Sequence, residues 1–240
     1  MAIKRLTAAL IALSFAGTAA AVPNGTALFD TFNNIADDGV NDVNVYTDMI
    51  SDDLDALWTL DANGVGSATI IVELAGFAGL NKFGVYSGSD YVELFAGAAA
   101  AGDKALLHID ASGSVFTGTL FGGVSDTGVD FAANQFGFYL NSPQGIFHSE
   151  TDKNTDGVDH MLAYQGVGEN VTLPDGISGP WASNEYILGF EDLYGGGDQD
   201  YADFVVMIES ISPIPEPGLA ALLGVGLIGL GLSRRKNYAA

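Results

Sequence analysis

The sequence predicts an all-β fold: one antiparallel β-sandwich of jelly-roll or Greek-key type over residues 22–213. Two observations predict it. Short β-prone runs recur at regular intervals, separated by turns rich in Gly, Asn, Asp and Ser. No long stretch carries the 3.6-residue apolar period of a helix. A signal peptide (1–21) and a C-terminal segment (214–240) with a short hydrophobic helix are expected to flank this single domain.

The N-terminal segment has the three parts of a secretory signal peptide. Lys4 and Arg5 form a basic region, residues 6–16 an apolar region, and small residues including Ala19 and Ala21 a cleavage site. We therefore expect signal peptidase to cleave after Ala21, and the mature domain to begin with the next residue.

The first part of the mature domain is polar and acidic. Apolar residues at i, i+4, i+7 and i+8 predict a short helix over residues 48–58. The acids here are spread through polar sequence, so we interpret them as a solvated face; they are Asp37, Asp38, Asp42, Asp48, Asp52, Asp53 and Asp55.

The rest of the domain consists of predicted strands. A Pro-containing linker at residues 212–217 leads into the C-terminal segment, and no other linker divides the body. The strands are predicted over residues 67–74, 82–86, 91–95, 104–109, 114–120, 135–140, 160–164, 185–190 and 203–208.

Composition excludes several classes of function. The formal net charge is −22, and loss of both terminal segments leaves three lysines against 29 acids, a net charge of −26. Such a surface repels nucleic acid and anionic lipid, so both are excluded as partners, and it attracts cations. The chain has no cysteine, which excludes disulfides, thiol nucleophiles and Cys-ligated zinc.

The densest acidic motif lies directly before the last predicted strand. Three consecutive glycines let the backbone turn tightly among five carboxylates, those of Glu191, Asp192, Asp198, Asp200 and Asp203. Oxygen-rich loops of this kind bind hard cations such as Ca²⁺. We expect the ion at Asp198, Asp200 and Asp203, with Glu191 and Asp192 supporting the loop or supplying one ligand. The alternative is a solvated acidic hairpin loop without an ion.

A second cluster places oxygen-bearing side chains at i, i+2 and i+4, namely Asp152, Asn154 and Asp156, followed by Gly and then by Asp159. This order matches the first half of an EF-hand loop. The twelfth position is Ala163 rather than Glu, so the segment is not an EF-hand. It predicts a calcium loop within a β-protein, with an Asx-rich turn as the alternative.

Both clusters lie in a region that resembles a known family. The run Phe190-Glu191-Asp192, followed by G-G-D-x-D-Y-x-D at residues 196–203, is similar to the domain of unknown function 4114. The resemblance extends over about residues 67–210 and departs at Ala202, where the family often has Asn. It implies a β-rich, calcium-associated extracellular module, and it implies no activity.

The C-terminal segment resembles a second family. Pro215, Glu216 and Pro217 precede an apolar run of 14 residues (219–232), which ends at the basic residues Arg234, Arg235 and Lys236. As a helix this run spans about 21 Å, against the ~30 Å of a bilayer core. The three parts together resemble the PEP-CTERM sorting signal.

That resemblance implies transient insertion into the inner membrane of a Gram-negative bacterium and processing by an exosortase. It also implies delivery to the cell surface or to an extracellular polysaccharide (biofilm) matrix. The alternative is a helix that remains in the membrane.

Nothing in the sequence forms a complete catalytic arrangement. There are three histidines: His108 lies in an apolar strand, His148 adjoins Ser149 without a nucleophile-elbow motif, and His160 follows Asp159, where it could orient the metal loop. Asp126-Thr127-Gly128 is interpreted as a turn. We therefore predict a non-enzymatic protein, with a glycan hydrolase as the less favoured alternative.

The main alternative to the favoured hypothesis, ahead of the hydrolase, is a carbohydrate-binding module or adhesin. Trp181 lies in a predicted loop at residues 179–184, where an exposed indole could stack on exopolysaccharide. The favoured hypothesis remains an exported surface or matrix protein that Ca²⁺ stabilises.

Overall fold

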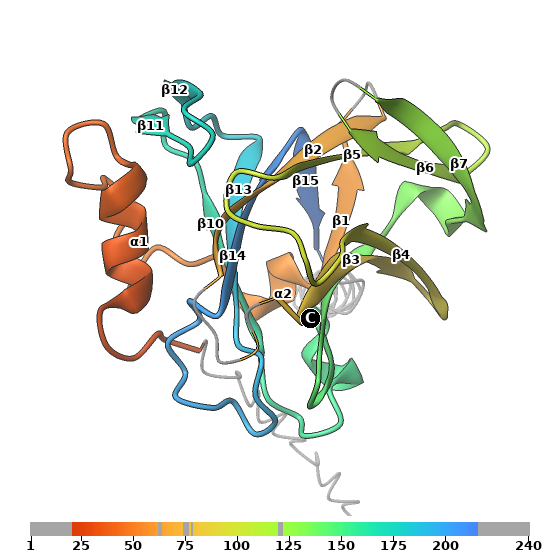
Figure 1. Ribbon diagram of the computed structural model, residues 1–240. Coiled ribbons are helices and arrows are strands. Elements are labelled where there is room, and N and C mark those ends of the chain that lie inside the picture. The colour runs from red at the N-terminus through yellow and green to blue at the C-terminus, as the bar shows by residue number, and fades with distance from the viewer. Residues whose placement is uncertain (1–20, 62–63, 74–76, 78, 120–121, 216–240) are drawn as a thin grey trace, which may run out of the picture.

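The computed structural model describes residues 21–61, 64–73, 77, 79–119 and 122–215 (Figure 1). Residues 1–20 and 216–240 lie outside them, and so do the predicted signal-peptide residue Ala19 and the sorting residues Glu216, Pro217, Arg234, Arg235 and Lys236. Within the described ranges, no helix has the length and apolar character needed to cross a bilayer.

Two antiparallel sheets form the body of the domain, with neighbours that are often distant in sequence. The smaller sheet has the order β4 (Asp90–Phe95), β3 (Lys82–Ser87), β8 (Gly137–Ser142) and β9 (Gly145–His148). The larger sheet has the order β10 (Met161–Gln165), β13 (Glu185–Phe190), β14 (Phe204–Glu209), β2 (Val65–Glu73), β5 (Lys104–Ile109), β6 (Ser114–Thr119) and β7 (Gly123–Asp130).

The main core lies between these sheets. Alternate residues of each strand point into it, as the two-residue period of a strand requires. The ring of Phe83 in β3 is fully buried and stacks on Phe138 of β8 and on Phe204 of β14, with centroids 5.7 and 5.3 Å away. Phe190 of β13 meets Phe83 edge-on at 5.8 Å. The predicted antiparallel β-sandwich is confirmed.

A second core lies on the opposite face of β10, β13 and β14, where helix α1 (Ala27–Ile35) covers the sheet (Figure 1). The helix contributes the buried side chains of Leu28, Phe32 and Ile35 to this core. The small hairpin of β11 (Asn170–Thr172) and β12 (Ser178–Pro180) contributes Val171 to the same core. Helix α1 was not predicted from the sequence.

The helix predicted over residues 48–58 forms only in the middle of that range. Both ends of the range pair with strands instead. At the first end, the amide of Ile50 donates a hydrogen bond to the carbonyl of Ala163 in β10 (2.8 Å). Leu57 already belongs to β1 (Leu57–Leu60), which pairs with β15 (Ile211–Ile214). Only the short helix α2 (Asp52–Asp55) remains between them.

Two further differences concern strands and turns. Strands β1, β7, β9, β11, β12 and β15 were not predicted from the sequence. Asp126-Thr127-Gly128 lies within β7 rather than in a turn between strands. A register shift opposite Val115 and Phe116 accommodates this triplet, in which the amide of Gly128 donates to Asp126 Oδ1 (2.8 Å). Two 3₁₀ turns, η1 (Ala132–Asn134) and η2 (Thr151–Lys153), complete the described elements.

Packing of α1 on the sheet predicts a test. Phe32 is fully buried and meets the rings of Tyr164 and Trp181 edge-on, at 5.0 and 5.7 Å. Phe32→Ala should lower the free energy of unfolding by about 3 kcal/mol or more, because it leaves a cavity. Phe29→Ala, on the exposed face of the same helix, is the matched control and should change it by less than about 1 kcal/mol. Urea unfolding measures both, and equal effects would contradict the docking.

Candidate functional site

A candidate metal site lies at the end of β13 and β14 where the loop of residues 191–203 joins the two strands. The last pair in the register is Phe190 with Phe204, so the adjoining residues Glu191 and Asp203 lie opposite one another. On its other side, the amide of Glu191 donates to the carbonyl of His160 (3.0 Å), which continues the pairing with β10. The sheet itself therefore fixes two of the carboxylates.

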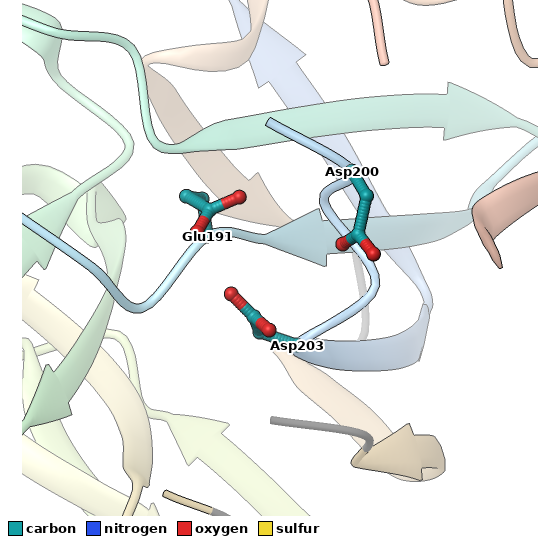
Figure 2. Close-up of side chains that lie close together, drawn as sticks. All are labelled: Glu191, Asp200 and Asp203. Carbon is teal, nitrogen blue, oxygen red and sulfur yellow. The ribbon is translucent and has the colours of Figure 1, made fainter. Parts of the chain in front are cut away.

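Asp200 is the third member, and it enters from the loop before β14 (Figure 2). One carboxylate oxygen from each of Glu191, Asp200 and Asp203 lies within 4.8 Å of the other two. Gln199 and Tyr201, on either side of Asp200, have left-handed backbone conformations with φ of 60° and 54°. The amide of Ala202 donates to Asp200 Oδ1 (2.8 Å), which closes an Asx turn around this aspartate.

Glu191 is the most unusual member because its side chain is fully buried. Neither of its carboxylate oxygens accepts a hydrogen bond from a protein donor. Gly197 packs directly against it, and a Cβ at that position would overlap Oε1. A buried charge without a partner costs several kcal/mol or more, so this carboxylate requires either a proton or a cation.

The electrostatics of the trio agree with its geometry. Burial, followed by the charge of Asp203, raises the pKa of Glu191 to about 9. Burial also raises the pKa of Asp203 to about 6, although its Oδ2 accepts the Asp192 amide (3.0 Å). Burial raises the pKa of Asp200 as well. The site therefore resists three negative charges unless positive charge is bound among them.

A hollow of about 240 Å³ opens beside the trio, and Asp198 and Asp200 line one side of it. The N-terminal residues of the described chain form the other side, where the Asn24 amide donates to the carbonyl of Gln199 (2.7 Å) and its side chain to that of Asp198 (3.1 Å). This contact holds the acidic loop while one edge of the site stays open to solvent.

Two of the five carboxylates predicted for this loop lie outside the trio. Asp192 is buried and accepts a hydrogen bond from the side-chain amide of Asn81 (2.8 Å). Asp198 is exposed at the rim of the hollow. Of the three ligands expected from the sequence, Asp200 and Asp203 belong to the trio, whereas Glu191 takes the place expected for Asp198.

The predicted calcium loop at Asp152, Asn154, Asp156 and Asp159 does not assemble, so that prediction is wrong. Asn154 turns inward, where Oδ1 accepts the His148 amide (2.7 Å) and Nδ2 donates to the carbonyl of Val158 (2.9 Å). The side-chain oxygen of Asn154 therefore binds a backbone amide and does not point toward an ion. Asp152 is exposed, and among the described residues the only acidic trio of metal-binding geometry is that of Glu191, Asp200 and Asp203.

Asp156 and His160 instead connect the two loops. Asp156 Oδ2 accepts hydrogen bonds from His160 Nε2 (2.9 Å) and from the Gly195 amide (2.8 Å). The other ring nitrogen of the buried His160 lies 3.0 Å from the carbonyl oxygen of Glu191. His160 thus supports the backbone of the metal site, and it stacks on Phe147 at 3.9 Å.

The prediction that Trp181 is exposed is also wrong. Its side chain is fully buried rather than exposed, because the indole packs on Phe32 of α1 and its N–H donates to the carbonyl of Glu185 (3.0 Å). The ring is therefore inaccessible to a glycan. Ser149, next to His148, is likewise buried, and its hydroxyl donates to the carbonyl of Ala56 (2.7 Å).

Two family models match the chain. The domain of unknown function DUF4114 matches residues 125–210, a narrower span than the sequence suggested but one that contains the whole trio. The PEP-CTERM protein-sorting motif matches residues 213–236. Both resemblances are confirmed, and the motif identifies an exported protein that an exosortase processes. No curated protein matches the chain significantly.

The raised pKa of Glu191 predicts how stability depends on pH when metal is absent. The folded state holds this proton up to about pH 9, whereas the unfolded chain releases it near 4.5. The stabilisation is therefore complete at low pH and is lost as pH rises between these values, by up to about 1.4 kcal/mol per pH unit.

Urea unfolding in EDTA at about pH 5.5, 7 and 8.5 should show this decline, and Glu191→Gln should make it shallower. Asp90→Asn, at an exposed position of β4, is the control and should keep the wild-type slope. A Glu191→Gln variant with an unchanged slope would contradict the assignment.

Proposed function

We propose that the mature protein is a non-enzymatic component of the bacterial cell surface or extracellular polysaccharide matrix, whose β-sandwich is stabilised by bound Ca²⁺. One observation carries the proposal: Glu191 is fully buried without a hydrogen-bond donor, and it faces Asp200 and Asp203. Export and exosortase processing follow from the sorting motif and supply the extracellular context.

The geometry of the trio fits a calcium ion. Two oxygens that bind one Ca²⁺ at about 2.4 Å each can lie at most about 4.8 Å apart. The oxygens of Glu191, Asp200 and Asp203 satisfy that limit. Calcium takes six to eight oxygen ligands, so backbone carbonyls or water from the adjoining hollow would complete the shell.

No lysine of the described chain is available to neutralise the site. Each forms its ion pair elsewhere: Lys82 with Glu93 (3.2 Å), Lys104 with Asp175 (2.8 Å) and Lys153 with Glu150 (3.7 Å). A metal ion is the remaining source of positive charge for the trio when all three members are ionised.

The role of the ion would be structural. It would connect the ends of β13 and β14 to Asp200, and so hold in place the loop that joins the two strands. The loop conformation on either side of Asp200 is strained, which an ion would offset. Because the unfolded chain does not hold the three oxygens together, binding would stabilise the folded state alone.

Calcium is expected to raise the thermal unfolding midpoint of the mature protein relative to EDTA, in a concentration-dependent way. Asp200→Asn combined with Asp203→Asn should remove that rise, because two of the three charged ligands become neutral. Asp38→Asn combined with Asp90→Asn changes the net charge equally at exposed positions and should keep it. Calorimetry in graded calcium measures all three proteins, and an unresponsive wild type would refute the metal site.

Processing by exosortase is expected to remove the C-terminal tail. Intact-mass measurement of protein released from the producing cells should give a chain that begins near Val22 and ends near Pro217. The same strain without its exosortase should retain the tail in the membrane fraction. A released wild-type protein whose mass includes residues 218–240 would contradict cleavage.

A further inference from the structure

An aromatic cluster lies on the outer face of the smaller sheet. Alternate residues of β3 and β8 point away from the main core, and on this outer side they pair reciprocally. Gly84 lies opposite Tyr139, and Gly137 lies opposite Tyr86. A Cβ built at Gly84 or at Gly137 would lie only 2.7 or 2.5 Å from the tyrosine ring opposite. Each of these two rings therefore lies directly against the backbone of a glycine.

Tyr91 of β4 forms a second layer on these rings. It stacks on Tyr86, with ring centroids 5.7 Å apart, and Tyr139 meets it edge-on at 5.1 Å. The Tyr91 hydroxyl lies 2.8 Å from Nε2 of His148 in β9. Tyr86 is held in turn by a hydrogen bond from its hydroxyl to Glu150 (2.7 Å). These contacts fix the orientation of the Tyr91 ring.

Tyr91 differs from the two tyrosines beneath it because it is exposed. Tyr86 and Tyr139 are buried although they lie on the outside of the sheet, whereas 39% of Tyr91 is exposed. The contacts of Tyr91 use one ring face, one edge and the hydroxyl, so the other ring face is the part that meets solvent. A ring that is already ordered loses little conformational entropy when it binds a ligand.

The charged side chains around this cluster balance one another. Lys82 pairs with Glu93 at 3.2 Å, and Lys153 pairs with Glu150 at 3.7 Å and lies 5.4 Å from the centre of the Tyr86 ring. Two of the three lysines of the mature protein therefore lie on or beside this face, although the mature chain has a net charge of −26. An anionic ligand would gain nothing here and would be repelled by the rest of the molecule, whereas a neutral ligand would not be repelled.

The exposed apolar surface of this face suits a small ring better than a second protein. Within the described chain, its large exposed apolar side chains are Tyr91 and Ile146, which lie on the two edge strands β4 and β9. A stable protein interface buries about 800 Å² on each partner around an apolar centre. Two side chains at opposite edges do not form such a centre, whereas one free tyrosine face matches the C–H face of a sugar ring in size and polarity.

We propose that Tyr91 is the contact through which this face binds a neutral hexose polysaccharide. The C–H face of one sugar ring would stack on the free face of Tyr91. Its hydroxyls would form hydrogen bonds with Glu93, which follows two residues later on the same side of β4, and with the paired Lys82. The assignment rests on the proposed function for the presence of a polysaccharide, and it uses no residue of the metal site.

Affinity electrophoresis of the mature protein in native gels tests the proposal. Hydroxyethylcellulose and galactomannan are the neutral probes, and polygalacturonate is the anionic one. At least one neutral polymer should retard the wild type, and Tyr91→Ala should raise the apparent dissociation constant about tenfold. Tyr91→Phe keeps the ring and should keep most of the retention, while Tyr91→Leu provides a second loss in case Tyr91→Ala does not fold. Phe29→Ala removes a ring of α1 with the same 39% exposure and should behave as the wild type.

Other results would overturn the assignment. These are no retention by either neutral polymer, retention by polygalacturonate alone, or equal losses in Tyr91→Ala and Phe29→Ala. A wild-type dimer that Tyr91→Ala dissociates in sedimentation velocity would assign this face to a second copy of the chain instead.

The metal site is tested separately in the same gels. Asp200→Asn combined with Asp203→Asn should keep the retention, because neither residue lies on this face. A wild type that is retained by a neutral polymer but whose unfolding midpoint does not respond to calcium would refute the metal site and leave the polysaccharide contact in place. A wild type that responds to calcium without retention would do the reverse.

Discussion

The pairing of β13 with β14 is the constraint on which the rest of the structure depends. Side chains alternate across these strands, so Phe190 and Phe204 enter the core between the sheets, while Ile187 and Val205 enter the core under α1. One hairpin therefore supports both cores. A one-residue slip in its register would exchange the two sets of side chains and break both cores at once.

The same register produces the acidic site. Once Phe190 opposes Phe204, the backbone leaves Glu191 and Asp203 facing one another at the sheet end, inside packed protein on one side. Apolar burial holds these carboxylates together against their repulsion. Core packing therefore places two of the three carboxylates. The glycine-rich loop then positions the third, that of Asp200, beside them.

Sequence patterns predicted the strands and the acidic loop because both are local signals. A two-residue apolar period indicates strands, and glycines among acids indicate a tight anionic turn. Helix α1 was missed although its buried residues Leu28, Phe32 and Ile35 recur at i, i+4 and i+7, which is a helical period visible in the sequence. The burial of Trp181 depends on its contact with α1 and is not visible in the sequence.

Side-chain direction explains the other errors. Spacing at Asp152, Asn154 and Asp156 suits a calcium loop, but an Asn can satisfy nearby backbone groups instead, as Asn154 does. Conversely, Asp55 sits among acids that were interpreted as a solvated face but is itself buried, and only the pairing of Ile50 with Ala163 carries its helix into the protein. Ligand spacing therefore predicts a metal site only when the surrounding fold leaves the oxygens free.

Because the chain has no cysteine, the proposed ion would stabilise the fold where other exported proteins use a disulfide. A disulfide typically contributes about 2–4 kcal/mol to the stability of a folded domain. An ion present at about one hundred times its dissociation constant contributes about 2.7 kcal/mol, and only to the folded state. Extracellular calcium could thus replace a covalent cross-link in this protein. Because the carboxylates repel one another without the ion, stability would also depend on location: the domain would be weakest where calcium is scarce and most stable after export.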